Sequence, residues 1–426
     1  MRRRVVITGL GVVAPNGIGK EAFWNACISG RSGIRRITRF DASQMPVQIA
    51  GEVTNFCPEA LGLTGDEHKS LDLATQYAVA SANLAMQDAG LTNVLSEEEH
   101  DHTGVAIGTA MACVDAAEIL WVAYTDAGTH PPRLPVDDFI LSTRLNTHAS
   151  AAAVASHHQL HGPCFALTTA CSAGADAIGE AFWAIQDGYA DRMLAGGSDS
   201  AITRLGIGVF SNIGALSRRN EDPERASRPY DRERDGFVLA EGAGVLVLEE
   251  REVALARGAH VYAEVISFSS NSNSYHMTSL PENGVPLQQL LEQALYDAQI
   301  SREQLDYINS HGSSTVLNEV AETSAYKAFF GEYAYHIPIS STKSMIGHTQ
   351  GAASAIETIV TALTLDRQII PPTINQEYPD PRCDLDYVPN VARQAIVNVA
   401  LTHSSGFGGV NSALILARPD WINNKL

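Results

Sequence analysis

The chain has 426 residues, of which 45% are hydrophobic and 18% are charged, and its formal net charge is -19. This composition supports one or two large cores, and the net negative charge argues against nucleic acid, whose phosphates would be repelled. No stretch approaches the roughly 20 apolar residues that span a membrane. The apolar run near the start is short and broken by glycines, as in a strand, so we expect a cytoplasmic protein with no membrane partner. The six cysteines are scattered without CxxC pairs, which indicates neither disulfides nor a metal site.

The first part of the chain alternates strand and helix patterns, as is typical of an α/β protein. The predicted elements are, in chain order, a strand over 4–8, a helix over 20–29, a helix over 71–89, a strand over 103–109, a buried alanine-rich helix over 142–158, a buried strand over 165–169, a helix from 173 to about 188, a strand over 191–195, and a strand, glycine break and strand over 237–249.

A charged segment near 250–258 leads into a second series that repeats the first in outline. Its predicted elements are a strand over 260–269, a helix over 286–299, a strand over 306–309, a helix over 316–330, a strand over 337–341, a helix over 347–365 that opens with small residues, and strands over 395–401 and 412–417. We interpret the chain as two similar halves, 1–252 and 253–426. The alternative is one large irregular α/β domain.

Cys171 lies in GPCFALTTACSAGADAIG, between a predicted strand and a predicted helix. The unpaired N–H groups and the dipole at a helix start favour a thiolate, so we expect a pKa below the ordinary value of about 8.5. A buried structural cysteine is the commoner occupant of such a turn, so the nucleophile hypothesis depends on partners elsewhere.

Three later stretches supply the residue types that a thiolate needs. His311 follows an apolar strand in INSHGSSTVLNE, and STKSMIGHTQGAASAIE contributes Lys343, His348 and Glu357 around the start of a helix. The turn in LTHSSGFGGVNS can bring backbone N–H groups close to a ligand. Taken singly, each has a structural explanation, such as a hydrogen-bonded histidine or a Lys343–Glu357 salt bridge.

Taken in order, Cys171, HGSST, KSMIGHTQGAAS and SGFGG resemble the β-ketoacyl synthase family, the condensing enzymes of fatty acid and polyketide synthesis. The flanking segments VVITGLGVVAPNG, ASRPYDRERDGFVLAEGAGVLVLEE and IIPPTINQEYPDP are similar too. The resemblance implies an α/β thiolase fold, in which two similar halves form a five-layered α/β/α/β/α core, normally in a dimer.

The resemblance also implies roles for individual residues. Cys171 would accept the acyl group, and the backbone N–H groups of Cys171 and Phe407 would hold the oxyanion. His311 and His348 would donate hydrogen bonds to the malonyl thioester oxygen, and Lys343 would position the cluster by pairing with Glu357. The expected reaction is a decarboxylative Claisen condensation with no metal or redox cofactor, on substrates carried by the phosphopantetheine of an acyl carrier protein. This reaction requires the sulfur of Cys171 and the imidazoles of His311 and His348 to lie in one cavity.

Within the family, YPDPRCDLDYVPNVAR and LTHSSGFGGVNS resemble the ketosynthase alpha subunit of type II polyketide synthases, which pairs with a cysteine-lacking chain length factor. A homodimeric fatty-acid elongating synthase is the alternative. The resemblance places Met111, Ser405 and Gln350 around the substrate pocket. Ser405, Gln350 and Val316 depart from residues common in the family, which indicates an unsaturated or more polar acyl chain.

Arg218, Arg219 and Arg225 form a candidate docking patch for an acidic carrier protein, although ordinary pairing with nearby carboxylates explains them equally well. A thiolase is disfavoured because the turn at 406–409 lacks the second cysteine of that class, and His348 disfavours the initiating synthase. A noncatalytic, pocket-shaping partner subunit is the alternative outside enzymes, and the intact Cys171 and His311 disfavour it.

Overall fold

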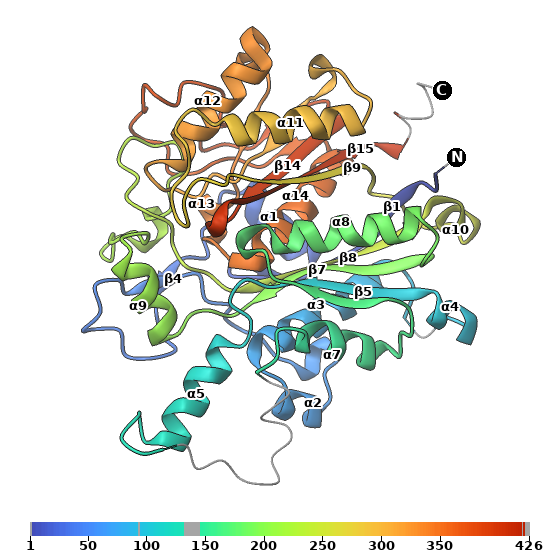
Figure 1. Cartoon of the computed structure of the whole chain (residues 1–426), viewed down its shortest axis with the longest axis horizontal. Helices are drawn as coiled ribbons and strands as arrows, with labels where there is room; N and C mark the ends of the chain where they lie inside the picture. Colours follow the sequence, from blue (N-terminus) through green and yellow to red (C-terminus); the bar gives the residue numbers. More distant parts are fainter. Residues whose placement is uncertain (1, 93, 132–144, 420, 422–426) are drawn as a thin grey trace.

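The fold is built on one mixed β-sheet that contains two five-stranded segments (Figure 1). The computed structural model describes residues 2–92, 94–131, 145–419 and 421. The first segment has the order β6-β5-β7-β8-β1, and the second has the order β11-β10-β14-β15-β9. Their strands are β1 (Val5–Ala14), β5 (Thr103–Gly108), β6 (Cys164–Leu167), β7 (Arg192–Asp199), β8 (Gly242–Glu250), β9 (Ala263–Ser272), β10 (Tyr307–Asn309), β11 (Ile339–Ser340), β14 (Val399–Ser405) and β15 (Val410–Ala417).

The two segments have the same connectivity. Numbered along the chain within each half, the strands of both segments lie in the order 3-2-4-5-1. In both, the first two pairings are parallel and the last two are antiparallel. The segments join where β1 pairs with β9. This repeat confirms the prediction of two similar halves.

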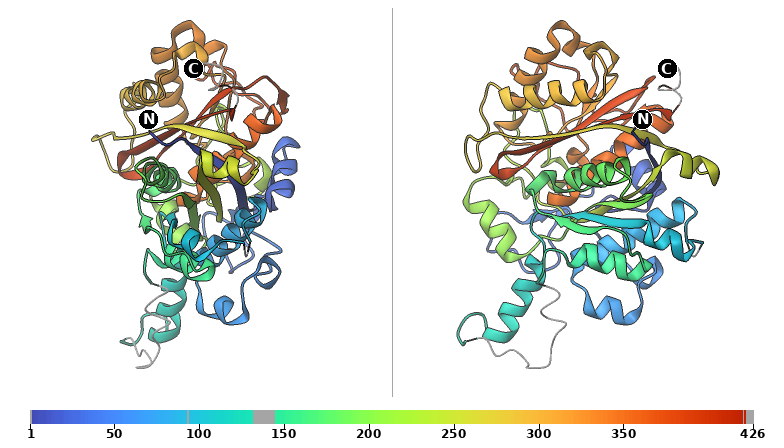
Figure 2. Two further views of the ribbon diagram at one scale, coloured as in Figure 1. Left: turned by 90° about the vertical axis from the view of Figure 1, so that its right-hand side faces the viewer. Right: turned by 45° about the vertical axis from the view of Figure 1, so that its right-hand side comes forward.

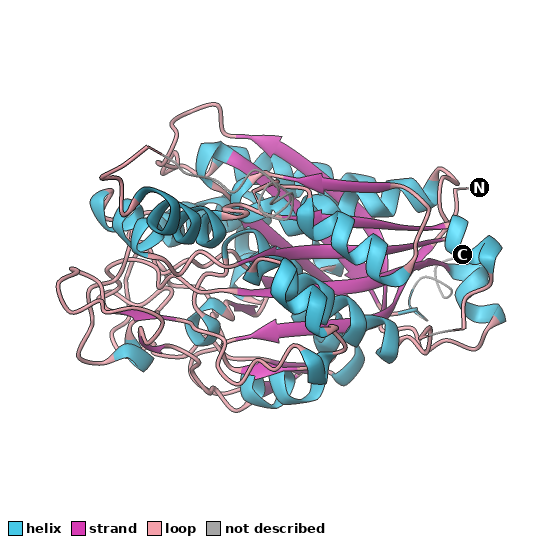
Figure 3. Cartoon of the chain, turned by 90° about the horizontal axis from the view of Figure 1, so that it is seen from below, coloured by secondary structure: helices cyan, strands magenta, loops and turns pink. Residues whose placement is uncertain are grey.

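Helices form three layers around the two segments, so that the core has five layers (Figures 1 and 2). Helices α8 and α14 lie between the segments and contact strands of both. Helices α3 and α7 cover the outer face of the first segment, α11 covers that of the second, and α12 packs on α11. Figure 3 shows the strands with helices on either side. Their bounds are α3 (Leu73–Asp88), α7 (Ala149–His158), α8 (Ala173–Gln186), α11 (Val285–Asp297), α12 (Asn318–Phe330) and α14 (Ala353–Arg367).

Shorter elements surround this core. They are β2 (Gly17–Ile18), α1 (Lys20–Ile28), β3 (Arg35–Arg36), β4 (Ile49–Ala50), α2 (Gly65–Ser70), α4 (Glu97–Asp101), α5 (Val114–Thr125), α9 (Arg204–Asn212), α10 (Arg251–Ala256), α13 (Lys343–Ile346), β12 (Ile369–Ile370) and β13 (Arg393–Gln394). Among the described helices, none has both the length and the apolar character needed to cross a membrane.

Small residues explain why α8 and α14 occupy the central layer. A helix enclosed between two sheets has no solvent face, and α14 is buried from Ala353 to Leu365. The helices approach so closely that a Cβ on Gly174 would lie 2.8 Å from the Cβ of Ala355. Small residues on both helices therefore allow α8 and α14 to pack together in the central layer.

Several boundaries and burial predictions were wrong. Residues 237–241 form only isolated bridges rather than a strand, because their bridge partners Leu216, His348 and Gly51 lie in three different segments. Strand β7 continues through its glycine pair to Asp199, and β14 begins at Val399 instead of 395. Strand β6 is partly exposed instead of buried, because it lies at the edge of the sheet.

Helix α7 is also shorter and less buried than predicted. It begins at Ala149, and residues 142–144 of the predicted helix lie outside the described residues. It lies on the outer layer, so only Ser150, Ala151 and Val154 are buried and its other side chains are at least partly exposed.

Candidate active site

Cys171 lies in the short turn Ala170–Ser172 between β6 and α8, as the strand-to-helix prediction required. The thiol is buried, and burial raises its pKa to about 11, although the ammonium of Lys343 opposes this shift. The prediction of a lowered pKa was therefore wrong. Loss of water around a charged sulfur outweighs the favourable helix start and the nearby cation. Cys171 is a neutral thiol in the resting protein at pH 7.

The glycine turn of the second half lies directly against this cysteine. A Cβ on Gly406 would lie 3.1 Å from the backbone nitrogen of Cys171, so only glycine permits this approach without a shift. The backbone N–H groups of Phe407 and of Cys171 itself are within hydrogen-bonding reach of the sulfur. Two donors that converge on one point are the arrangement that stabilises an oxyanion.

His311 follows β10 and is buried. Its Nδ1 lies 3.2 Å from Oγ of Ser404, and that hydroxyl donates to the carbonyl oxygen of Cys171 at 3.0 Å. Because a hydroxyl has one hydrogen, this network assigns the imidazole proton to Nδ1, which donates to Ser404. Burial, Lys343 and His348 hold the pKa of His311 well below its usual range, so the ring is neutral and its Nε2 is an acceptor.

His348 has the opposite tautomer. The backbone N–H of Gln350 donates to Nδ1 of His348 at 3.1 Å, which leaves the ring proton on Nε2. Burial and Lys343 lower the pKa of His348 well below its usual range, so this ring is also neutral. Hydrogen bonds from its N–H to Val238 and from Ala240 to its carbonyl fix the backbone. The neutral His348 therefore offers one N–H donor at Nε2.

Lys343 and Glu357 form a fully buried ion pair beneath the two histidines. The ammonium also donates to the carbonyl oxygen of His311 at 2.7 Å, so it ties that residue to α14. Burial raises the pKa of Glu357 to about 7, against the opposing effect of Lys343. The structure thus confirms the predicted pairing.

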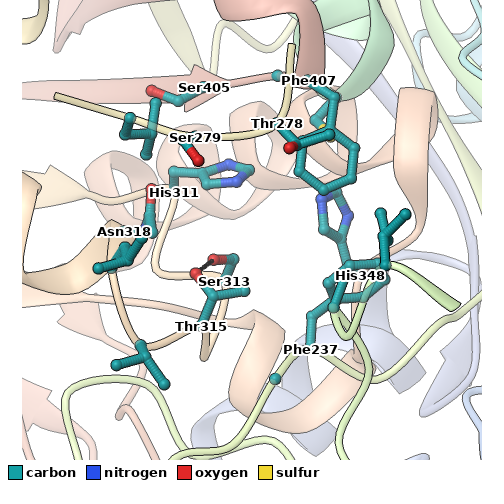
Figure 4. Close-up of a pocket in the computed structure, with 18 of the residues that line it drawn as sticks. Phe237, Thr278, Ser279, His311, Ser313, Thr315, Asn318, His348, Ser405 and Phe407 are labelled. Carbon is teal, nitrogen blue, oxygen red and sulfur yellow. Dashed lines mark hydrogen bonds between the residues drawn. The ribbon is translucent and has the colours of Figure 1, made fainter. Parts of the chain in front are cut away.

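One cavity of about 300 Å³ brings the predicted groups together. Cys171, His311 and His348 all line it, and the two imidazole rings lie 5.4 Å apart between centroids. Figure 4 shows both imidazole rings among other residues that line the cavity. Other lining residues include Phe237, Thr278, Ser279, Ser313, Thr315, Asn318, Gln350, Ser405 and Phe407.

Met111 does not line this cavity. It packs instead on the apolar cluster that Phe407 also contacts, and Asp199 accepts a hydrogen bond from its backbone N–H. The prediction of Met111 as a direct cavity residue was therefore wrong. Sequence reasoning also missed Ser404, whose position next to the glycine turn was the only available signal.

The candidate docking arginines are largely paired. Arg219 lies 3.5 Å from Glu233 and 4.0 Å from Asp235, and Arg225 lies 3.2 Å from Glu377. The backbone N–H of Arg218 donates to Asp235, a residue that lines the cavity. Two of the three arginines therefore contact a residue that lines the cavity. Among the described residues, no group of three or more His, Cys, Asp or Glu side chains is arranged to hold a metal ion.

The fold and this site define an acyl-transferring enzyme of the thiolase fold. Residues 2–254 match the β-ketoacyl synthase N-terminal domain, and residues 262–377 match the C-terminal domain. The chain belongs to the β-ketoacyl synthase family, whose members are acyltransferase ketosynthases.

Full-length relatives come from two pathways. The chain is 43% identical to the tetracenomycin polyketide synthase ketoacyl synthase alpha subunit of Streptomyces glaucescens, over 98% of this chain and 97% of that protein. It is 44% identical to the 3-oxoacyl-[acyl-carrier-protein] synthase 2 of Coxiella burnetii, over 98% of this chain and 99% of that protein.

Solved structures agree over the whole chain. A type II polyketide synthase ketosynthase, solved with its acyl-carrier protein and bound to the hexaketide, is similar with a TM-score of 0.89 and 39% identity, over 98% of this chain and 100% of that one. The ishigamide ketosynthase/chain length factor is similar with a TM-score of 0.89 and 34% identity, over 98% of this chain and 100% of that one.

Proposed function

We propose that Cys171, His311 and His348 carry out a decarboxylative Claisen condensation between a Cys171-bound acyl group and a malonyl thioester. The observation that carries this proposal is the convergence of the three side chains on one cavity. The two histidines have different tautomers, so we assign them different roles rather than two equivalent donors.

In the first step, the sulfur of Cys171 attacks the thioester carbonyl of the incoming acyl group. The thiol is neutral at pH 7, so its proton must be accepted, and Nε2 of His311 is the acceptor nitrogen in the cavity. The N–H groups of Phe407 and Cys171 hold the oxyanion of the tetrahedral intermediate. Collapse of this intermediate expels the carrier thiolate, which takes the proton from Nε2 of His311 and leaves as a thiol.

In the second step, a malonyl thioester loses carbon dioxide. The electrons of the broken carbon–carbon bond move into an enolate, whose oxygen accepts a hydrogen bond from Nε2–H of His348. The enolate carbon attacks the acyl carbonyl on Cys171, and the Cys171 thiolate leaves and takes a proton from solvent water. The product is a β-ketoacyl thioester two carbons longer, and no electron leaves the substrates, so the proposed steps need no redox cofactor or metal.

We infer that both substrates arrive on the phosphopantetheine of an acyl carrier protein. Arg218 and Arg219 contact Asp235, which lines the cavity, and this proximity supports docking of an acidic carrier at this point. Arg225 pairs with Glu377, so we assign it only a secondary role in carrier docking.

We further propose assembly with a chain length factor homologue in a type II polyketide synthase. Helix α5 extends away from the layered core, and Ile119, Trp121 and Val122 on it are at least half exposed (Figures 1 and 2). An exposed apolar helix is typical of a subunit interface. A homodimer is the alternative, and co-expression with a cysteine-lacking homologue followed by size-exclusion chromatography distinguishes the two.

A boundary between the halves at 252/253 and a cytoplasmic location stay predictions.

Malonyl-dependent elongation tests the enzymatic proposal. The purified chain, alone and with the candidate partner, should convert acyl-carrier and malonyl-carrier into a product two carbons longer. Elongation that survives Cys171→Ala would contradict the role of this cysteine, and no elongation by either preparation would favour a noncatalytic subunit.

A further inference from the structure

Gln350 has a buried amide without a hydrogen-bond partner in the candidate active site. Its side chain is 3% exposed and lines the cavity that contains Cys171. Within the described part of the chain, the amide nitrogen is buried with no partner. Buried polar groups are nearly always hydrogen-bonded, and leaving one unpaired is costly, so this amide requires an explanation.

Hydrogen bonds fix the backbone at Gln350. Its N–H donates to Nδ1 of His348, and the next N–H, of Gly351, donates to the buried carboxylate of Asp199 at 2.6 Å. The turn Gln350–Ala352 also packs against the turn Ala170–Ser172 that carries Cys171. The Gln350 side chain therefore lines the same cavity as Cys171, from a turn that packs against the turn of the cysteine.

A saturated acyl chain offers no partner to this amide. An oxygen within the first few carbons of the chain does, since the oxygen of a 3-oxo group or of a 3-hydroxy group accepts a hydrogen bond from the amide N–H. We propose that Gln350 is a specificity-determining residue that hydrogen-bonds an oxygen on the acyl chain close to the thioester. This inference rests on the proposed function, because it assigns the acyl group to Cys171.

Self-acylation of Cys171 without malonyl tests this inference. The probes are N-acetylcysteamine thioesters of hexanoic and 3-oxohexanoic acids, which differ by one oxygen, and the readout is the rate of mass increase on the Cys171 peptide. We expect the 3-oxo thioester to acylate the wild-type chain at least fivefold faster, and Gln350→Leu to reduce this ratio to about one. Gln293→Leu, the same change on the exposed face of α11, should keep the wild-type ratio.

The outcomes separate the inference from the proposed function. Equal wild-type rates, or a preference that survives in Gln350→Leu, would overturn the inference and leave the ketosynthase proposal intact. Acylation by neither thioester would contradict the proposed function and the inference with it. If Gln350→Leu does not fold, Gln350→Met removes the amide with an unbranched side chain and must give the same loss of preference. An effect confined to malonyl-dependent turnover would also overturn the inference.

Discussion

Gly406 approaches Cys171 so closely that a Cβ at position 406 would lie 3.1 Å from the backbone nitrogen of the cysteine. This contact sets the position of the Phe407 N–H relative to the sulfur. We predict that Gly406→Ala displaces the turn and slows acylation of Cys171 by roughly 100-fold, the effect of losing one oxyanion donor. Intact-protein mass spectrometry measures this rate. Gly65→Ala is the control, because a Cβ there meets nothing within 4 Å, and an unchanged rate in Gly406→Ala would contradict the proposed oxyanion site.

The buried Lys343–Glu357 pair predicts a large loss of stability when one partner is removed. Lys343→Met should lower the free energy of unfolding by about 3–5 kcal/mol, because it leaves Glu357 buried without a cation. Urea unfolding measures the change. Arg393→Met breaks the partly exposed pair with Asp386 and should cost below about 1 kcal/mol. Equal losses in the two variants would show that burial of the first pair is unimportant.

The raised pKa of Cys171 predicts how its alkylation depends on pH. Only the thiolate reacts with iodoacetamide, and burial raises the thiol pKa to about 11. The rate at Cys171 should therefore rise about tenfold per pH unit from 7 to 9.5 without a plateau. Site-resolved mass spectrometry measures this profile, and a plateau below pH 9 would instead indicate a thiolate stabilised by its surroundings.

The tautomer of His348 predicts which substitution preserves function. His348→Ala removes the Nε2–H donor and should slow malonyl decarboxylation by roughly 100- to 1000-fold. His348→Gln places an amide N–H near the same position and should retain more of the rate. Release of carbon dioxide from a malonyl thioester is the measurement. Equal losses in both variants would argue against a donor role for this nitrogen.

Much of the fold could be predicted from sequence because its signals are local. The sequence patterns place several elements where the structure has them: the first strand, β1, the periodic helix α3, and the small-residue helices α8 and α14. The order of the chemical motifs then predicted a shared cavity, which the structure contains.

The remaining errors concern properties that depend on the whole fold. The pKa of Cys171 depends on complete burial by segments more than 100 residues away, which no local pattern reveals. Likewise, Met111 packs on an apolar cluster instead of lining the cavity. Arg219 pairs with Glu233 and Asp235, which are 14 and 16 residues further along the chain. Ser404 links His311 to Cys171. Its only sequence signal is its position next to the glycine turn, and that signal is weak because serine is common at strand ends.

The most direct test of the account is the site of acyl transfer. After incubation with an acyl-carrier thioester, peptide mass spectrometry should find the acyl group on Cys171 alone, and subsequent addition of malonyl-carrier should discharge it as a chain two carbons longer. Cys113→Ala should behave as the wild type, since Cys113 does not line the cavity. An acyl group on another cysteine, or one on Cys171 that malonyl-carrier never discharges, would contradict the account.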